Sequence, residues 1–194
     1  GYNLFGFCEN LSDVKINYLT FIYNETIKPF VTSITIPDYV ITLDDGLFYG
    51  CTNLTSITIP ESVTSIGNEA FTACSSLTSI TIPDSVTSIG NGAFARCSSL
   101  TSITIPDSVI NIGEGAFEDC SSLTSIIIPD SVTCIREYTF YGCSNLTSIT
   151  LPDTITFIGG SRNNIFEGCL NLKNMYISYN TYISFKDILK EYVT

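Results

Sequence analysis

The sequence repeats itself every 23 residues, and this period constrains the fold more than any other feature. Three residue types mark it, each at a fixed place in the unit. Proline recurs at Pro37, Pro60, Pro83, Pro106, Pro129 and Pro152. Phenylalanine recurs at Phe48, Phe71, Phe94, Phe117 and Phe140, and cysteine at Cys51, Cys74, Cys97, Cys120 and Cys143. One such unit cannot bury its apolar side chains alone, so the period predicts a solenoid of stacked units.

The first half of a unit predicts a strand followed by a turn. Ile57 and Ile59 alternate with Ser56 and Thr58, which is the period of a strand with one buried face. Pro60 ends this strand because proline has no N–H to donate. The acidic residue and the serine that follow are typical of a turn, in which the acidic side chain binds the backbone two residues further on.

The second half of the same unit predicts a shorter strand and a tight turn. Val63 and Ile66 form a second apolar pair, and Gly67 suits a left-handed backbone position that closes it. Phe71 and Cys74 lie at helical spacing, which predicts one helical or 3₁₀ turn that packs inward. Strands of successive units would pair in parallel, about 4.7–4.9 Å apart.

The repeat predicts a single solenoid over residues 1–194. Within it, residues 1–30 are interpreted as degenerate N-terminal repeats, residues 31–171 as regular repeats and residues 172–194 as a C-terminal cap. The chain begins with Gly1 in the middle of a unit, so we expect it to be part of a longer chain.

The last residues predict a helix that covers the end of the stack. Ile188, Leu189 and Tyr192 lie at helical spacing, and Ser184 is a candidate N-cap. An open solenoid end exposes strand edges, which favours a covering segment. Docking onto the rest of a longer protein is the alternative.

The composition argues against several classes of function. The absence of histidine removes the commonest general base, the commonest metal ligand and every Ser-His or Cys-His nucleophile. A net charge of -11 argues against binding to nucleic acid. No apolar run reaches the roughly 18 residues of a membrane span, so we expect no membrane insertion of this segment. We expect no catalytic residue, no cofactor and no metal.

The cysteine column predicts buried free thiols that pack as small hydrophobic groups. No two cysteines have the close spacing of a zinc site. Stacked units would keep the Cβ atoms about 4.8 Å apart, which is longer than the roughly 3.8 Å that a disulfide prefers. Isolated disulfides are the alternative. Cys8 and Cys134 lie off the regular column and are the candidates for reactive thiols.

An acidic column follows the prolines, and we expect its members to stack along one edge of the solenoid. Its members are Asp38, Glu61, Asp84, Asp107, Asp130 and Asp153. Ordinary turn chemistry explains an acidic residue after proline. A site for divalent cations is the alternative, because such ions bind several oxygens.

Six consecutive units over residues 31–169 carry the pattern L-x-x-I-x-I-P-x-x-V-x-x-I-G-x-x-A-F-x-x-C. This pattern resembles the 23-residue, Treponema-type leucine-rich repeat of BspA-like proteins. The resemblance implies a leucine-rich-repeat horseshoe with a parallel β-sheet on the concave face. Short second strands and 3₁₀ or helical turns would lie on the convex side, so that strands and turns dominate.

The resemblance also implies a function. It indicates a non-enzymatic module for protein binding and adhesion, at the cell surface or outside the cell, and it transfers no catalytic residue. An intracellular or assembly-bound structural scaffold, located in the cytoplasm and without a small-molecule ligand, is the alternative. The expected partner is a protein.

The predicted binding face consists of the outward side chains of the main sheet. These are Ser56, Thr58, Ser79, Thr81, Ser102, Thr104, Ser125, Ile127, Ser148, Thr150, Asn174 and Tyr176. Most carry small hydroxyls. Ile127 and Tyr176 break the pattern with an apolar side chain and with an amphipathic ring of the kind that anchors interfaces. The preference of β-branched residues for strands is an alternative explanation for Ile127.

Overall fold

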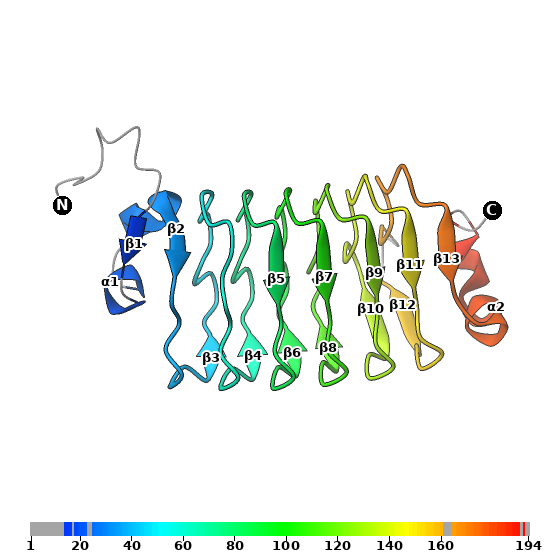
Figure 1. Ribbon diagram of the computed structural model, residues 1–194. Helices are drawn as coiled ribbons and strands as arrows, with labels where there is room; N and C mark the ends of the chain where they lie inside the picture. Colours follow the sequence, from blue (N-terminus) through cyan, green and yellow to red (C-terminus); the bar gives the residue numbers. More distant parts are fainter. Residues whose placement is uncertain (1–13, 17, 23–24, 161–163, 191, 193–194) are drawn as a thin grey trace.

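The chain winds into coils that stack along one axis, as Figure 1 shows for the computed structural model. The structure describes residues 14–16, 18–22, 25–160, 164–190 and 192. Each coil contributes a short strand to a first row, a second short strand to another row, and a series of turns to the side opposite the first row. This arrangement confirms the predicted solenoid of stacked units.

The first row of strands runs along the front of Figure 1. Its strands are β2 (Val31–Ile34), β5 (Ser79–Thr81), β7 (Ser102–Thr104), β9 (Ser125–Ile127), β11 (Ser148–Thr150) and β13 (Asn174–Tyr176). Pairing is parallel and joins equivalent residues of successive units, such as Ile80 with Ile103. In the unit between β2 and β5 the strand is reduced to single bridges at Thr58. The Thr55 N–H of this unit bonds to the Thr32 carbonyl oxygen of the preceding coil, with an N···O distance of 3.5 Å.

The second row confirms the shorter strand predicted for each unit. It contains β3 (Thr42–Leu43), β4 (Ser65–Ile66), β6 (Ser88–Ile89), β8 (Asn111–Ile112), β10 (Cys134–Arg136) and β12 (Phe157–Gly159). The first four form one sheet, and β10 pairs with β12. Their alternate residues, such as Ile66 and Ile89, point into the core.

The third side of each coil consists of turns closed by i to i+3 hydrogen bonds, of which Cys74 N–H to Phe71 O (3.1 Å) is an example. Other backbone groups bond to the next coil, as in Phe71 N–H to Ala93 O at 2.7 Å. Residues with positive φ, such as Glu69 (φ 55°) and Gly92 (φ 59°), interrupt the turns. No continuous helix therefore forms in the described part of this side.

The prediction for Gly67 is wrong, because its backbone is not left-handed. Glycine is required there by close packing between coils. A Cβ at Gly67 would lie 2.6 Å from the Leu43 carbonyl oxygen, and one at Gly90 would lie 2.5 Å from the Asn68 nitrogen. The left-handed positions come two residues later, at Glu69 and Gly92.

The phenylalanine column forms a stack through the core. Neighbouring ring centroids lie 5.0–5.8 Å apart along Phe21, Phe48, Phe71, Phe94, Phe117, Phe140 and Phe166. Each stacked pair stabilises the fold by about 0.5–1.5 kcal/mol beyond its buried area. Phe21 belongs to the degenerate N-terminal part and still occupies the phenylalanine position of its coil.

The cysteine column also links the coils. Five thiols of the column each donate a hydrogen bond to the phenylalanine carbonyl of the preceding coil, for example Cys74 Sγ to Phe48 O at 3.2 Å; they are Cys74, Cys97, Cys120, Cys143 and Cys169. The described cysteines are all free thiols, as expected from the Cβ spacing. Cys134, which lies off the column, is half-buried. Cys8 lies outside the described residues.

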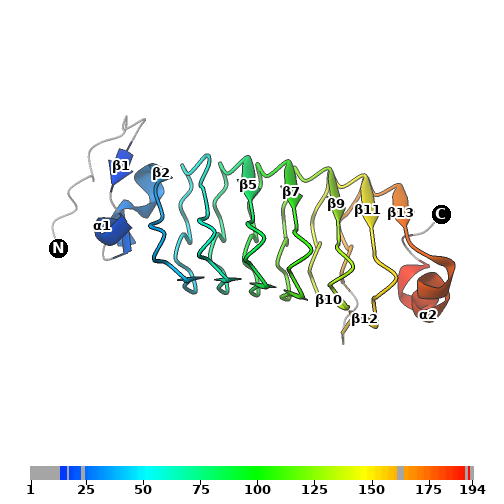
Figure 2. The same cartoon turned by 60° about the horizontal axis from the view of Figure 1, so that its bottom comes forward.

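Short helices lie at both ends of the stack (Figure 2). At the N-terminal end, β1 (Val14–Ile16) pairs in parallel with β2, and α1 (Tyr18–Ile22) and the 3₁₀ helix η1 (Glu25–Phe30) join them. At the C-terminal end, α2 (Tyr179–Leu189) buries Leu189, as the predicted terminal helix requires.

Ser184 is not the N-cap of α2, so this prediction is wrong. Ser178 caps the helix with extended backbone angles (φ −68°, ψ 157°), and its hydroxyl accepts a hydrogen bond from the Thr181 N–H at 3.3 Å. An N-cap residue needs these non-helical angles. Ser184 lies inside the helix, where its hydroxyl donates to the Asn180 carbonyl at 3.0 Å.

Candidate binding face

The structure places the side chains of the predicted binding residues on one surface, which we call the Ser/Thr face. It comprises Ser56, Thr58, Ser79, Thr81, Ser102, Thr104, Ser125, Ile127, Ser148, Thr150, Asn174 and Tyr176, and each of these is exposed or half-buried. Strand register aligns them in two columns along the stack. Between β7 and β9, the Thr124 N–H continues the stack by bonding to the Thr101 carbonyl at 3.3 Å.

Ile127 and Tyr176 lie in the same column of the Ser/Thr face with only Thr150 between them. Thr150 of β11 pairs with Ile127 of β9 on one side and with Tyr176 of β13 on the other. Ile127 is 68 % exposed and Tyr176 is 59 % exposed. Two strand spacings separate them, which is about 10 Å. The two large side chains of this face therefore lie within reach of one partner segment.

A hollow of about 550 Å³ adjoins Ile127 at the edge of the face. Ile127, Pro129 and Pro152 line it together with three carboxylates, those of Asp107, Asp130 and Asp153. This hollow was not predicted from the sequence, because side chains of three successive coils form it. The signal in the sequence that could have indicated it was the outward Ile127, which comes two residues before Pro129 and three before Asp130 of the acidic column.

The acidic column stacks along this edge but does not make the turns in the predicted way. The Val63 N–H closes the turn by bonding to the Pro60 carbonyl at 3.0 Å. The serine after the acidic residue bridges to the preceding coil, as in Ser62 Oγ to Val40 O at 2.7 Å. Within the described residues, no carboxylate of this column has a hydrogen bond or an ion pair. The carboxylates face solvent, and hydroxyl side chains next to them make the bonds between coils.

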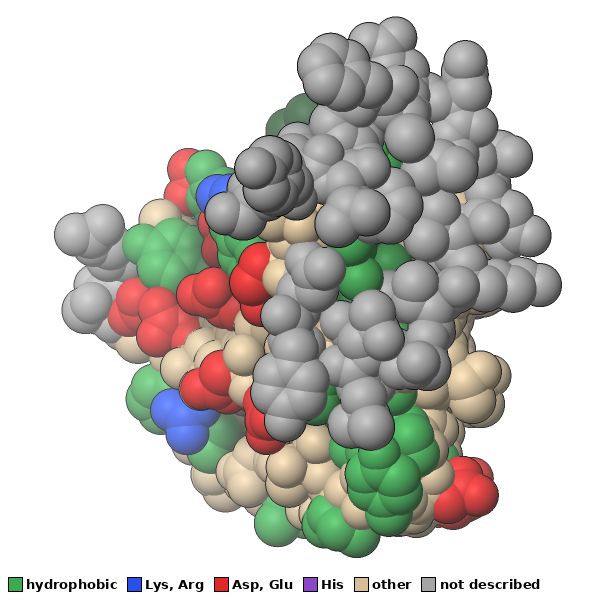
Figure 3. All heavy atoms as spheres, turned by 90° about the vertical axis from the view of Figure 1, so that its left-hand side faces the viewer, with side chains coloured by type: hydrophobic (Ala, Val, Ile, Leu, Met, Phe, Trp, Pro, Cys, Tyr) green, Lys and Arg blue, Asp and Glu red, His purple; other side chains and the backbone are tan. Residues whose placement is uncertain are grey.

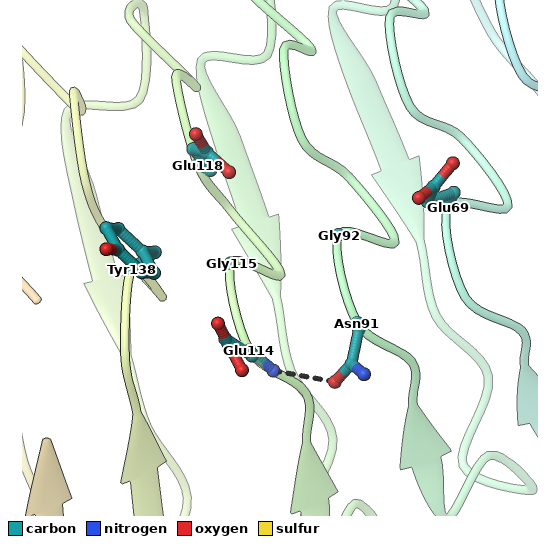
Figure 4. A pocket seen from close by; sticks show the side chains of 7 residues that line it. All are labelled: Glu69, Asn91, Gly92, Glu114, Gly115, Glu118 and Tyr138. Atoms are coloured by element: carbon teal, nitrogen blue, oxygen red, sulfur yellow. Dashed lines mark hydrogen bonds between the residues drawn. The ribbon is translucent and has the colours of Figure 1, made fainter. Parts of the chain in front are cut away.

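The turn side carries a second depression, of about 300 Å³, which Figure 4 shows. Its lining includes Gly92 and Gly115 and four larger residues, Glu69, Glu114, Glu118 and Tyr138. The view from the N-terminal end in Figure 3 shows acidic side chains gathered on its left, which is the back of Figure 1. The signal in the sequence was a repeat position at which two consecutive coils have glycine, Gly92 and Gly115, between larger residues in the flanking coils.

The turn-side depression does not bring reactive groups to one point. Glu69 comes from one coil, and Glu114 and Glu118 come from the coil two further along. The Glu114 N–H bonds to Asn91 Oδ1 at 2.9 Å (Figure 4). Burial, followed by the charge of Asp119, raises the pKa of Glu118 above its usual value. Across the described residues, no group of three or more Cys, Asp or Glu is arranged to hold a metal ion.

The buried thiols are poor nucleophiles in this structure. Burial raises the pKa of Cys97 and that of Cys169 to about 12. The thiolate is the reactive form of cysteine, and it is scarce at neutral pH for such groups.

The helices that the structure describes are too short and too polar to cross a membrane.

Comparison with protein families gives a match over most of the chain. The profile of the BspA-type leucine-rich repeat region, with six copies of the repeat, matches residues 20–123 and residues 67–187. No protein of curated function gives a significant match.

Solved structures of leucine-rich repeat proteins resemble the chain. One from Treponema pallidum is 30 % identical, with a TM-score of 0.72, and the match covers 90 % of this chain and 76 % of that one. Another from Bacteroides ovatus is 37 % identical, with a TM-score of 0.73, and the match covers 84 % of this chain. The chain spans only 41 % of the length of the Bacteroides ovatus protein. A third, from Eubacterium ventriosum, is 25 % identical with a TM-score of 0.57, covering 76 % of this chain and 49 % of that one.

Proposed function

The chain belongs to the BspA-type leucine-rich repeat family, and from this membership we propose that it is a non-enzymatic module for protein binding and adhesion. Leucine-rich repeat proteins generally act as protein-interaction modules. We further propose that the partner binds the Ser/Thr face and that the chain is displayed at the cell surface or outside the cell. The family resemblance is the support for this location.

The placement of Ile127 and Tyr176 carries the proposal. Both side chains interrupt a column of hydroxyls, both are more than half exposed, and only Thr150 separates them. Apolar and aromatic side chains that become buried on binding supply most of the affinity of a protein interface. The surrounding serines and threonines supply hydrogen-bond donors and acceptors but little apolar area.

Selection from a phage library of random short peptides tests this proposal. The wild-type chain serves as bait, and peptides that also bind the variant Ile127→Thr plus Tyr176→Thr are removed. Threonine is the residue at equivalent positions of the same column, such as Thr104 and Thr150, so the variant retains a side chain that the fold already accepts. We expect to recover peptides that bind the wild type and not the variant.

A matched control uses two exposed isoleucines next to the second row of strands. Ile41 and Ile110 directly precede β3 and β8, and their own column carries threonine in other coils. The variant Ile41→Thr plus Ile110→Thr should retain the selected peptides. Recovered peptides that lose binding to the Ile41→Thr plus Ile110→Thr variant would show that the binding face lies elsewhere. Failure to recover any peptide dependent on Ile127 and Tyr176 would also reject this face.

A further inference from the structure

We infer that the hollow beside Ile127 binds an extended, lysine- or arginine-bearing segment of the partner protein. This inference rests on the proposed function, because it identifies the chemistry of the partner at one end of the Ser/Thr face. Its basis is an exposed apolar side chain beside a ladder of three carboxylates that the fold leaves without partners of their own.

Charge decides which kind of partner fits the hollow. Asp107, Asp130 and Asp153 are exposed, and in the described part of the chain none of them pairs with a cation or a hydrogen-bond donor. Residues 31–160 hold thirteen carboxylates and only two arginines, so this part of the array carries the whole net charge of -11. The hollow is therefore strongly negative, which attracts cations and repels acidic partners.

The two arginines of the array do not neutralise the hollow. Arg96 lies among the turns, beside Glu69 and Glu118. Arg136 ends β10 in the second row of strands. Neither lines the hollow. The cation that compensates its carboxylates must therefore come from solvent or from a partner.

The spacing of the ladder favours an extended polypeptide over a single small cation. The three carboxylates belong to successive coils, so strand spacing places the first and the last about 10 Å apart. Alternate side chains of an extended chain lie about 6.6–6.8 Å apart on one side. Two long cationic side chains can thus reach the ladder together, while their aliphatic stems cover Ile127.

A peptide of alternating lysine and threonine is the probe, with a peptide of alternating glutamate and threonine as its charge-reversed control. Binding is measured by fluorescence polarisation at about 0.15 M salt, where contacts beyond about 8 Å are screened. We expect the lysine peptide to bind and the glutamate peptide not to bind. Ile127→Thr should weaken binding of the lysine peptide.

The decisive comparison uses two triple variants that remove the same charge from the same column. The hollow variant carries Asp107→Asn, Asp130→Asn and Asp153→Asn, and the distal variant carries Asp38→Asn, Glu61→Gln and Asp84→Asn. Loss of the exposed ion pairs between the peptide and the ladder should raise the dissociation constant by about tenfold. We expect this loss for the hollow variant and a change of less than about threefold for the distal variant.

Equal losses in both triple variants would overturn the inference, because they would show nonspecific attraction to an acidic surface. Absence of binding to the wild type would overturn it as well. The composition of the phage-selected peptides separates this failure from failure of the proposed function. Peptides that need Ile127 and Tyr176 but have no excess of lysine and arginine would leave the binding face in place and reject the cationic partner.

Discussion

The thiol of Cys97 donates a hydrogen bond to the carbonyl oxygen of Phe71 across 3.2 Å, and so joins two successive coils. The same carbonyl accepts the Cys74 N–H of its own coil at 3.1 Å. The pattern recurs at Cys74, Cys120, Cys143 and Cys169. The cysteine column is therefore a hydrogen-bonded connection between coils as well as part of the apolar core.

We expect Cys97→Ala to lower the free energy of unfolding by about 1–2 kcal/mol, through the lost hydrogen bond and the space left by sulfur. Urea denaturation measures this change. Cys134→Ala is the control, because Cys134 is half-buried and off the column, and it should change stability by less than about 0.5 kcal/mol. Equal effects of the two substitutions would contradict the role given to the column.

Stability should fall as the pH rises from about 9 to about 12. Burial raises the pKa of Cys97 to about 12 from 9.0, so the unfolded chain loses this proton first. Ionisation of the thiol in the unfolded chain then stabilises the unfolded state and lowers the free energy of unfolding. Below pH 9 the thiol is protonated in both states, and its contribution to stability is fully present. Between these pH values the free energy of unfolding of Cys97→Ala should fall less steeply than that of the wild type. The two slopes should differ by up to about 1.4 kcal/mol per pH unit. Parallel slopes would show that Cys97 is not protected in this way.

Gly90 and Gly92 should respond differently to alanine. A Cβ at Gly90 would lie 2.5 Å from the Asn68 nitrogen, whereas the nearest atom to a Cβ at Gly92 is 3.5 Å away. We expect Gly92→Ala to cost about 1–2 kcal/mol, which is the strain of a left-handed residue. Gly90→Ala should cost more than this, because the coils must move apart. Thermal denaturation ranks the two variants, and the reverse order would contradict the packing argument.

Glu69→Gly should stabilise the fold. Glu69 has a φ of 55° and occupies the position at which Gly92 and Gly115 stand in the next coils. Relief of this strain, less the greater flexibility of glycine in the unfolded chain, should add about 0.5–1 kcal/mol. Glu69→Gln is the control, since it removes the charge and keeps the strain. A gain in Glu69→Gln equal to that in Glu69→Gly would assign the effect to charge.

The period of the sequence was sufficient to predict the two rows of strands and the interior columns. Alternation of Ile57 with its neighbours and recurrence of Phe71 both report burial directly. Contacts between coils were less accessible to sequence reasoning. Gly67 looked like a left-handed residue, but its role is to let two backbones approach, which depends on the spacing of coils.

The candidate site was likewise predictable within each unit but not where it depends on contacts between coils. The outward position of Ile127 and Tyr176 followed from strand alternation, and the structure places both side chains on the outer surface. The hollow beside Ile127 did not follow, because the expected stacking of Asp107, Asp130 and Asp153 does not by itself predict a concave surface, and each of them looked like a turn residue. Only the structure shows that these carboxylates do not bond to the backbone of the turn, and that serine and threonine hydroxyls form the side-chain hydrogen bonds there.

A titration observed on the isoleucine methyl groups by NMR tests the binding face most directly. The wild-type chain, labelled with ¹³C at isoleucine δ1, is titrated with a peptide selected as described above, and Ile127→Thr assigns the Ile127 signal. We predict that the Ile127 methyl signal shifts on saturation, while those of Ile41 and Ile110, which are also exposed, remain unchanged. Shifts at Ile41 or Ile110 with an unchanged Ile127 signal would contradict the account.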